Sequence, residues 1–223
     1  MNIKLLFSAL SKFVCGILLL GILLFLPANT MYFPGAWRFI SLLFIPMFIF
    51  GIVLFIKAPK LLEKRLNSKE SSNVQKKVLL FSALEFIMCF IVAGLDYRFG
   101  WSKLPMWLII AACVLFVFSY GLYAEVMREN AYLSRTIEVQ QGQQVITTGL
   151  YAVVRHPMYF AVVLLFWSMP LVIGSLYAFI VMIPFPLLLV SRIKDEEKIL
   201  EDGLIGYKEY KQKVKYRLIP FIW

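Results

Sequence analysis

The chain has 223 residues, of which 61% are hydrophobic, and a formal net charge of +10. Soluble domains are typically about 45–50% apolar, so this composition and the mean hydropathy of +0.79 exclude an ordinary soluble protein. The basic charge does not indicate nucleic-acid binding, because Lys and Arg flank the apolar segments and form no recognition motif. Membrane topology and anionic lipid headgroups explain these charges better. The sequence therefore predicts a membrane protein.

The first part of the chain contains successive apolar segments long enough to cross a bilayer. A spanning helix needs about 20 mostly apolar residues. The first segment lacks a small-residue cleavage site after its apolar core, so we expect it to remain as a helix rather than to be removed as a signal peptide. Four spans are predicted, at residues 5–27, 36–56, 78–95 and 105–124.

One further apolar block occupies residues 157–191. Pro170, Gly174 and Ser175 divide it into two pieces of marginal spanning length, which predicts a helical hairpin that either crosses twice or dips part way. The predicted fold is thus all-α and polytopic, with four spans plus a C-terminal hairpin, or five to six membrane helices in total.

The distribution of basic residues predicts the orientation. Seven of them crowd the stretch between the second and third spans: Lys57, Lys60, Lys64, Arg65, Lys69, Lys76 and Lys77. By the positive-inside rule this stretch faces the cytoplasm. The N-terminus, residues 125–156 and the tail from Arg192 then face the same side. A linker-like segment within residues 66–77 is the one break in composition, and we expect residues 1–124 and 125–223 to form one structural unit.

Cofactor-binding signatures of soluble enzymes, such as a P-loop or a GxGxxG turn, are absent from the sequence. The three cysteines, Cys15, Cys89 and Cys113, all lie inside apolar runs. There they are expected to act as small hydrophobic residues, so neither a metal site nor a redox pair is predicted.

The segment GLYAVVRHPMY, residues 149–159, contains the single histidine of the chain. Proline is favoured in the first turn of a helix, so Pro157 predicts a helix start. Taken alone, the segment is typical of a membrane boundary, with Arg155 extending to the interface, His156 capping the helix and Tyr159 in an aromatic belt.

A second polar segment begins where the last apolar run ends. Arg192 and Glu196 are four residues apart, which places them on one face of a continuing helix. They would supply one cation and one anion beside the membrane, or else form an ordinary surface ion pair. The tail GYKEYKQKVKYRL, from Gly206, alternates basic and aromatic residues, as expected of a short helix or arm that lies along headgroups and covers a pocket.

Together, GLYAVVRHPMY, the glutamates of DEEKIL and the ending GYKEYKQKVKYRLIP resemble the isoprenylcysteine carboxyl methyltransferase family of integral membrane enzymes. The resemblance covers roughly residues 125–223, which it identifies as a methyltransferase core. It implies transfer of a methyl group from S-adenosylmethionine, leaving S-adenosylhomocysteine, to a lipophilic acceptor from the bilayer, most simply a carboxylate such as that of an isoprenylcysteine.

The resemblance also implies the site residues. Arg192 matches the family's acceptor-binding arginine. The cofactor pocket, on the cytoplasmic side, falls on Gln140, Gln143, Gln144, Val145, Ile146, Tyr151, His156, Pro157, Met158, Tyr159 and Glu196. Gln143 stands where family members commonly carry a histidine, and its amide can form hydrogen bonds but cannot carry a proton. Arg155 is assigned a structural role.

Three other functions stay open at this stage. A phospholipid N-methyltransferase would use the same cofactor but would gain nothing from Arg192 with an amine acceptor. A membrane reductase would need a further phosphate site for NADPH, and no additional arginine cluster stands beside RHPMY. A non-catalytic lipid-binding protein would use these charges only for packing. In such a protein Glu85, within the third predicted span, would be one more polar packing residue. A glutamate in lipid is otherwise a functional candidate, but Glu85 has no visible partner and is not placed in the site.

Overall fold

The computed structural model describes residues 3–66, 73–133 and 139–223, and within these ranges the chain is helical and contains no strand. The predicted all-α fold is therefore confirmed. In chain order the elements are α1 (Ile3–Ala28), α2 (Pro34–Lys57), α3 (Pro59–Leu66), α4 (Asn73–Phe99), α5 (Met106–Glu129), the 3-10 helix η1 (Gly149–Ala152), α6 (Pro157–Ile173), α7 (Leu176–Met182), α8 (Phe185–Gly203) and α9 (Tyr207–Lys213).

The described residues include five segments long and apolar enough to cross a membrane. Four of them are α1, α2, α4 and α5, which correspond to the four predicted N-terminal spans. The fifth is the α7–α8 segment, Leu176–Gly203, and α6 before it is a shorter apolar helix of 17 residues. This pair is the predicted hairpin, so the chain is a multi-pass membrane protein. Much of the predicted linker, residues 67–72, lies outside the described residues.

The hairpin turns at Gly174, where φ is +101°, a left-handed conformation that favours glycine. Pro170, which we expected to mark the same division, lies inside α6 instead. Its carbonyl accepts hydrogen bonds from the backbone N–H groups of Gly174 and Ser175, which close the end of the helix. The division of the block is thus confirmed, but glycine rather than proline produces it.

A second interruption, at residues 183–184, separates α7 from α8 and was not predicted. Pro186 has no N–H to donate to the carbonyl of Met182, four residues before it. The Trp167 indole N–H donates to that carbonyl instead, at 3.0 Å. A side chain of α6 therefore replaces the backbone hydrogen bond that the proline removes from the returning arm of the hairpin.

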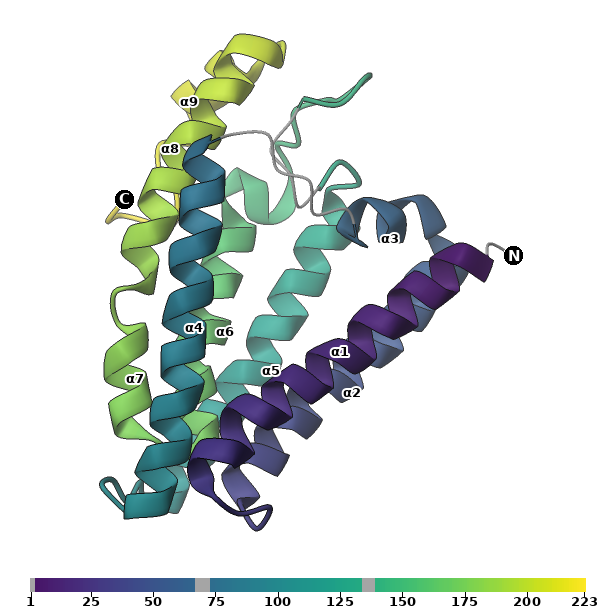
Figure 1. The fold of residues 1–223 in the computed structure, drawn as a ribbon. Coiled ribbons are helices and arrows are strands. Elements are labelled where there is room, and N and C mark those ends of the chain that lie inside the picture. The colour runs from purple at the N-terminus through teal and green to yellow at the C-terminus, as the bar shows by residue number, and fades with distance from the viewer. Residues whose placement is uncertain (1–2, 67–72, 134–138) are drawn as a thin grey trace.

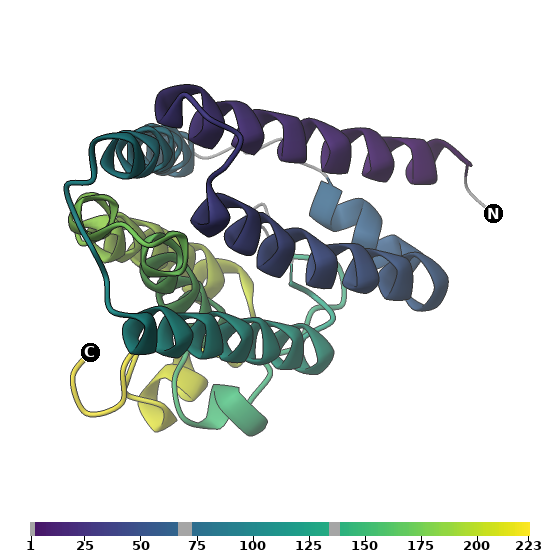
Figure 2. The ribbon, with the colours of Figure 1, turned by 90° about the horizontal axis from the view of Figure 1, so that it is seen from below.

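The helices form two groups that meet at one end of the bundle. α4, α6, α7 and α8 run side by side, whereas α1 and α2 lean away from them toward the α3 end (Figure 1). Viewed along the bundle, α2 lies between α1 and α5 (Figure 2). The buried residues of α1 are mostly in its second half and those of α2 in its first half, so both helices pack on the rest of the bundle near the loop that joins them.

Two glycines allow backbones to approach closely at this packed end. A Cβ atom on Gly35 of α2 would lie 1.8 Å from the Ile173 carbonyl oxygen, and one on Gly94 of α4 would lie 2.6 Å from that of Leu24. Small residues play this role in membrane helix pairs, where close contact between backbones replaces a hydrophobic driving force.

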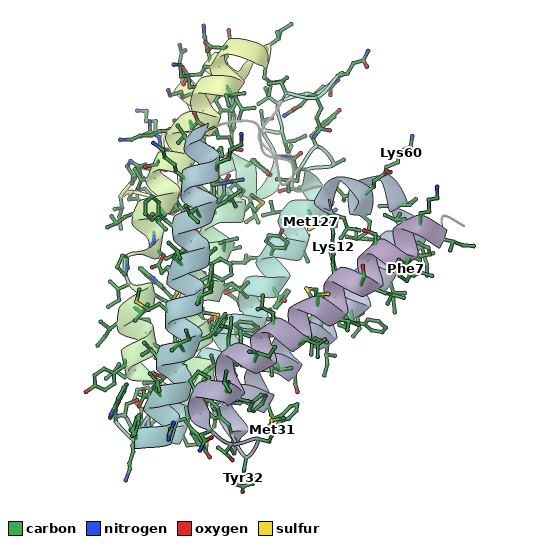
Figure 3. The ribbon with its side chains drawn as sticks, in the orientation of Figure 1. Phe7, Lys12, Met31, Tyr32, Lys60 and Met127 are labelled. Atoms are coloured by element: carbon green, nitrogen blue, oxygen red, sulfur yellow. The ribbon has the colours of Figure 1, made fainter. Side chains whose placement is uncertain are left out.

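Polar segments gather at the opposite end, where α3, the start of α6 and α9 all lie (Figure 1). Lys12 and Lys60 mark this end, whereas Met31 and Tyr32 mark the other (Figure 3). The Lys12 ammonium donates to the Leu66 carbonyl, which ties α1 to the end of α3. These segments were predicted to share one side of the membrane. That this side is the cytoplasm stays a prediction from the charge pattern.

A buried carboxylate holds the hairpin turn to the loop after α4. Asp96 is 2% exposed and accepts hydrogen bonds from the Ser102 backbone N–H at 2.7 Å, the Ser102 hydroxyl at 2.5 Å and the Ser175 hydroxyl at 2.5 Å. The Ser175 oxygen also accepts the Ala178 backbone N–H at the start of α7. One acidic side chain thus fixes the turn between the two arms of the hairpin.

Replacing Asp96 with alanine should lower the free energy of unfolding by about 1–3 kcal/mol, because buried donors lose their acceptor. Thermal unfolding of the purified protein in detergent measures this. Asp202→Ala, which removes an exposed carboxylate from α8, is the matched control and should change stability by no more than about 0.5 kcal/mol. Equal stability of the two variants would contradict the anchoring role of Asp96.

Candidate functional site

The site begins at the corner between α5 and α6, where the chain passes through η1. Gly149 has φ of +52°, and a Cβ atom there would lie 1.6 Å from Glu129 Oε1. The Glu129 carboxylate accepts the Leu150 backbone N–H at 3.1 Å, so the last residue of α5 holds the start of η1. Glycine is needed at this position both for its conformation and for its small size.

The C-terminal tail is bonded to the RHP segment through the backbone. The N–H groups of Arg155 and His156 donate to the carbonyls of Tyr216 and Arg217, each at 2.9 Å. The Arg155 guanidinium also donates to the carbonyls of Val214 and Lys215, at 2.7 and 2.8 Å. The RHP segment and the C-terminal tail, some 60 residues apart in sequence, therefore form one wall of the site.

Glu197 lies at the centre of this wall and is 3% exposed. Its Oε1 accepts from Arg155 Nε at 2.7 Å and lies 3.3 Å from His156 Nε2, and its Oε2 accepts from Arg217 Nε at 2.8 Å. Two guanidinium groups balance the buried carboxylate, which is the condition under which a charge is tolerated away from water. Arg155 is buried in this ion pair and does not extend to the interface. The contact agrees with the structural role expected of Arg155, which stays a prediction.

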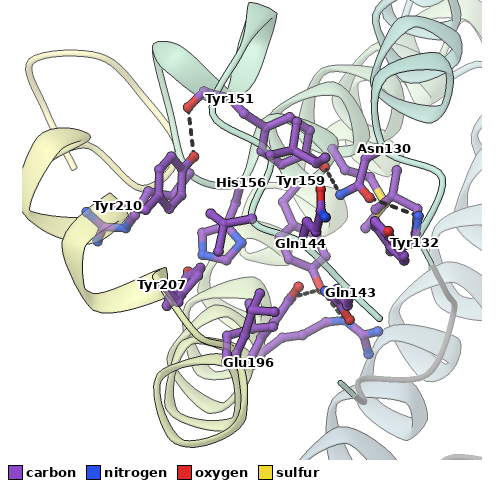
Figure 4. A pocket seen from close by; sticks show the side chains of 18 residues that line it. Asn130, Tyr132, Gln143, Gln144, Tyr151, His156, Tyr159, Glu196, Tyr207 and Tyr210 are labelled. Carbon is purple, nitrogen blue, oxygen red and sulfur yellow. Dashed lines mark hydrogen bonds between the residues drawn. The ribbon is translucent and has the colours of Figure 1, made fainter. Parts of the chain in front are cut away.

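A pocket opens between this wall and the 143–146 segment (Figure 4). Its empty volume is about 820 Å³, part of it open to solvent. Of the residues that the resemblance implied, all except Gln140 and Pro157 line it: Gln143, Gln144, Val145, Ile146, Tyr151, His156, Met158, Tyr159, Arg192 and Glu196. Their positions agree with a common site, but their function stays a prediction.

The Tyr159 hydroxyl bridges the two charged residues of α8. It donates to Glu196 Oε2 at 2.6 Å and accepts from Arg192 Nε at 2.9 Å. The Arg192 guanidinium carbon lies 5.8 Å from the centre of the Tyr159 ring. Arg192 and Glu196 thus share one face of α8, as their spacing predicted, and the first turn of α6 brings a phenol between them.

Hydrogen bonds within the loop shape the opposite wall. Gln143 Oε1 accepts the Gln140 backbone N–H at 2.9 Å, and the Gln140 amide donates to the Tyr132 carbonyl at 2.5 Å. The Tyr132 hydroxyl donates to the Gly142 carbonyl at 3.0 Å. Gln140 therefore lies behind the lining and orders the loop that carries Gln143. Residues 134–138 are outside the described residues.

Helix α9 covers the pocket with two tyrosines that sequence reasoning did not assign to the site. Gly206, with φ of +85°, turns the chain sharply after α8, and Tyr207 and Tyr210 then face inward. The Tyr210 hydroxyl donates to the Tyr151 carbonyl at 2.7 Å. Tyr207 and Tyr210 are three residues apart, which places both rings on one side of a helix. This spacing was the signal in the sequence that could have assigned them to the site. The other lining residues that were not predicted are Asn130, Tyr132, Leu133, Arg155, Leu200 and Leu204.

Two other sequence assignments lie elsewhere. Pro157 is buried and opens α6, as predicted, but does not line the pocket. Glu85 lies in α4, away from the pocket lining, and its Oε1 has no hydrogen-bond partner among the described residues. The cysteines are free and belong to three different helices, α1, α4 and α5.

Comparison with known proteins finds similarity to one enzyme family and to two sterol reductases. Residues 107–203 match the family described as phospholipid methyltransferase. The chain is 30% identical over 134 residues to the Delta(14)-sterol reductase TM7SF2 of Mus musculus, and 27% identical over 135 residues to the Delta(14)-sterol reductase of Methylotuvimicrobium alcaliphilum. Each alignment covers 54% of this chain and 32% of the reductase.

Residues 107–203 are therefore similar to the phospholipid methyltransferase family, and the chain is also similar to part of two sterol reductases. The matched residues span α5 to α8 and include Tyr159, Arg192 and Glu196. The alignments cover only about a third of each reductase, so the chain spans a part of these enzymes and not their whole length. The narrower resemblance to isoprenylcysteine carboxyl methyltransferases is not singled out by these matches.

Replacing Glu197 with glutamine should destabilise the wall by about 3–5 kcal/mol, because Arg155 would keep a buried charge without a counter-ion. The tail should then detach, and trypsin should cleave more rapidly after Lys213 and Lys215. Limited proteolysis followed by mass spectrometry measures this. Glu201→Gln, which removes a partly exposed ion pair with Lys211, should have an effect of about 1 kcal/mol or less. Unchanged cleavage in Glu197→Gln would contradict the proposed contact.

Proposed function

We propose that the protein is a methyltransferase that moves a methyl group from S-adenosylmethionine to the carboxylate of a lipophilic acceptor. The observation that carries the proposal is the Tyr159 hydroxyl bonded to both Glu196 and Arg192. It brings an anionic and a cationic side chain to one pocket at the point where α8 changes from apolar to charged sequence. Such a pocket suits one polar, positively charged ligand and one anionic, apolar ligand.

The charges of the lining favour S-adenosylmethionine over NADPH. Glu196 presents a carboxylate that suits an ammonium group or ribose hydroxyls. Of the two arginines in the described lining, Arg155 is already balanced by Glu197, so Arg192 is the one proposed to contact a ligand. The pyrophosphate and 2′-phosphate of NADPH carry several negative charges and would meet the Glu196 carboxylate beside this one arginine.

Arg192 is the residue proposed to orient the acceptor. Its planar guanidinium can bind a carboxylate through two parallel hydrogen bonds. The preceding part of α8, from Phe185 to Val190, is apolar, so an acceptor with a hydrocarbon chain can remain in the bilayer while its carboxylate reaches Arg192. The contact with Tyr159 fixes the direction of the guanidinium before the acceptor arrives.

The reaction requires positioning more than acid or base chemistry. S-adenosylmethionine supplies an activated methyl group on a sulfonium. A carboxylate acceptor is already ionised at pH 7, so no residue of the chain has to remove a proton. The contribution of Arg192, Tyr159 and Glu196 is to hold the reactants in line and out of water, which accelerates such steps greatly.

A second candidate function is a reductase, because the two sterol reductases are similar to this chain. The two functions differ in the ligand that should stabilise the protein. S-adenosylhomocysteine should raise the thermal unfolding temperature of a methyltransferase, whereas NADPH should raise that of a reductase. Stabilisation by NADPH alone would overturn the proposed function.

Replacing Glu196 with glutamine should weaken binding of S-adenosylhomocysteine by about tenfold to a hundredfold. A hydrogen bond to a charged group contributes roughly 1.5–3 kcal/mol, and each 1.4 kcal/mol corresponds to tenfold in affinity. Isothermal titration calorimetry measures the change, and Glu201→Gln serves as the control outside the pocket. Parent-like affinity in Glu196→Gln would show that Glu196 does not contact the cofactor.

Replacing Arg192 with lysine should reduce methylation by about a hundredfold. A single ammonium cannot orient a carboxylate as the two parallel hydrogen bonds of a guanidinium do, and a small displacement of the acceptor oxygen slows the transfer greatly. Binding of S-adenosylhomocysteine should remain within about threefold of the parent. Incorporation of tritium from labelled S-adenosylmethionine into membrane extracts measures turnover. Activity that survives this substitution would instead favour an amine acceptor, such as that of a phospholipid.

A further inference from the structure

Tyr207 is a buried pocket residue whose hydroxyl is not used within the described part of the protein. The residue is 4% exposed and lines the pocket from α9 (Figure 4). Its hydroxyl is shielded from solvent and has no hydrogen-bond partner among the described residues. Buried polar groups in native proteins nearly always have a partner, so this donor needs an explanation.

The neighbouring tyrosines of the pocket are different. The hydroxyls of Tyr159 and Tyr210 donate to Glu196 and to the Tyr151 carbonyl, and the Tyr151 hydroxyl accepts from the Asn130 amide. Each of these phenols therefore contributes to the internal structure of the site. Tyr207 has the same kind of position but no such bond, which points to a ligand as its partner.

The backbone fixes the Tyr207 ring. Gly206 adopts a left-handed conformation, and the Tyr207 N–H donates to the Leu204 carbonyl at 3.2 Å. The Tyr207 and Tyr210 rings pack with their centres 5.8 Å apart. A phenol held in this way loses little conformational freedom when it binds a ligand.

Electrostatics define which kind of ligand atom the phenol suits. Burial raises the pKa of Tyr207, and the nearby carboxylates of Glu197 and Glu196 raise it further. The phenol therefore stays neutral at pH 7 and acts as a hydrogen-bond donor. The same carboxylates disfavour an anionic ligand group beside it, so an uncharged oxygen or nitrogen is the partner that fits.

We propose that Tyr207 binds the cofactor by donating a hydrogen bond from its hydroxyl to an uncharged acceptor atom of the adenosyl group, either a ribose oxygen or a ring nitrogen. This inference rests on the proposed function, because it takes S-adenosylmethionine as the cofactor. It assigns α9 a direct part in binding, in addition to covering the pocket.

The test uses Tyr207→Phe, which removes only the hydroxyl. Its affinity for S-adenosylhomocysteine, measured by calorimetry on the full chain in detergent, should fall about threefold to tenfold, as expected for one neutral hydrogen bond. Its unfolding temperature without ligand should equal or exceed that of the parent, because no internal bond is lost. Affinity for adenosine, measured by competition, should fall by a similar factor.

Tyr120→Phe is the matched control. The Tyr120 hydroxyl donates to the Leu43 carbonyl at 2.9 Å and lies outside the pocket lining. This variant should lose thermal stability and keep the affinity of the parent for S-adenosylhomocysteine. The two substitutions remove the same atom, so opposite effects on stability and binding separate a ligand contact from a structural one.

The outcomes distinguish the inference from the proposed function. If the parent binds S-adenosylhomocysteine and Tyr207→Phe binds it equally well, the role of Tyr207 is wrong and the proposed function stands. If Tyr207→Phe lowers the unfolding temperature as Tyr120→Phe does, the hydroxyl has a structural role and the inference also fails. Loss of affinity for S-adenosylhomocysteine but not for adenosine would overturn the assignment to the adenosyl group. A parent that does not bind S-adenosylhomocysteine would overturn the proposed function itself.

Discussion

The buried carboxylate of Glu197 is the interaction on which the site depends. It joins α8 to the residues before α6 through Arg155 and to the C-terminal tail through Arg217. Removing a carboxylate of this kind leaves cations without a counter-ion in a region shielded from water, which costs much more than losing a surface ion pair. The segments that form the pocket are separate in sequence, and this ion-pair cluster joins three of them: α8, the residues before α6 and the tail.

The neighbouring position on α8 has a different role. Glu196 is directed to the pocket and Glu197 to the protein interior, because adjacent residues on a helix point about 100° apart. One helix therefore supplies both the support of the wall and the charge that faces a ligand. Tyr159, in the first turn of α6, is bonded to both Glu196 and Arg192. The geometry of these two residues therefore depends on the position of the start of α6, which Glu197 holds through Arg155.

Much of the fold could be predicted because long apolar runs and basic loops are strong local signals. The four N-terminal spans and the hairpin follow from these signals alone. The interruption before α8 has a local cause in Pro184 and Pro186, which the sequence analysis did not use. The contact by which the Trp167 indole replaces the lost hydrogen bond of the Met182 carbonyl could not be predicted, since it depends on tertiary structure. In the site, the spacing of Arg192 and Glu196 predicted a shared face. The burial of Glu197 and the direction of Tyr207 toward the pocket could not be predicted, because both depend on where the C-terminal tail packs.

The length of α6 has a consequence for the surrounding lipid. At 1.5 Å per residue, its 17 residues extend about 26 Å, less than the roughly 30 Å hydrocarbon core of a typical bilayer. The polar cluster of Asp96, Ser102 and Ser175 sits at its far end. A short span of this kind is accommodated by local thinning of the bilayer. If α6 crosses the bilayer, the headgroups of the far leaflet are therefore expected to be drawn inward beside the hairpin, while the longer helices α1, α2, α4 and α5 place no such demand on the lipid around them.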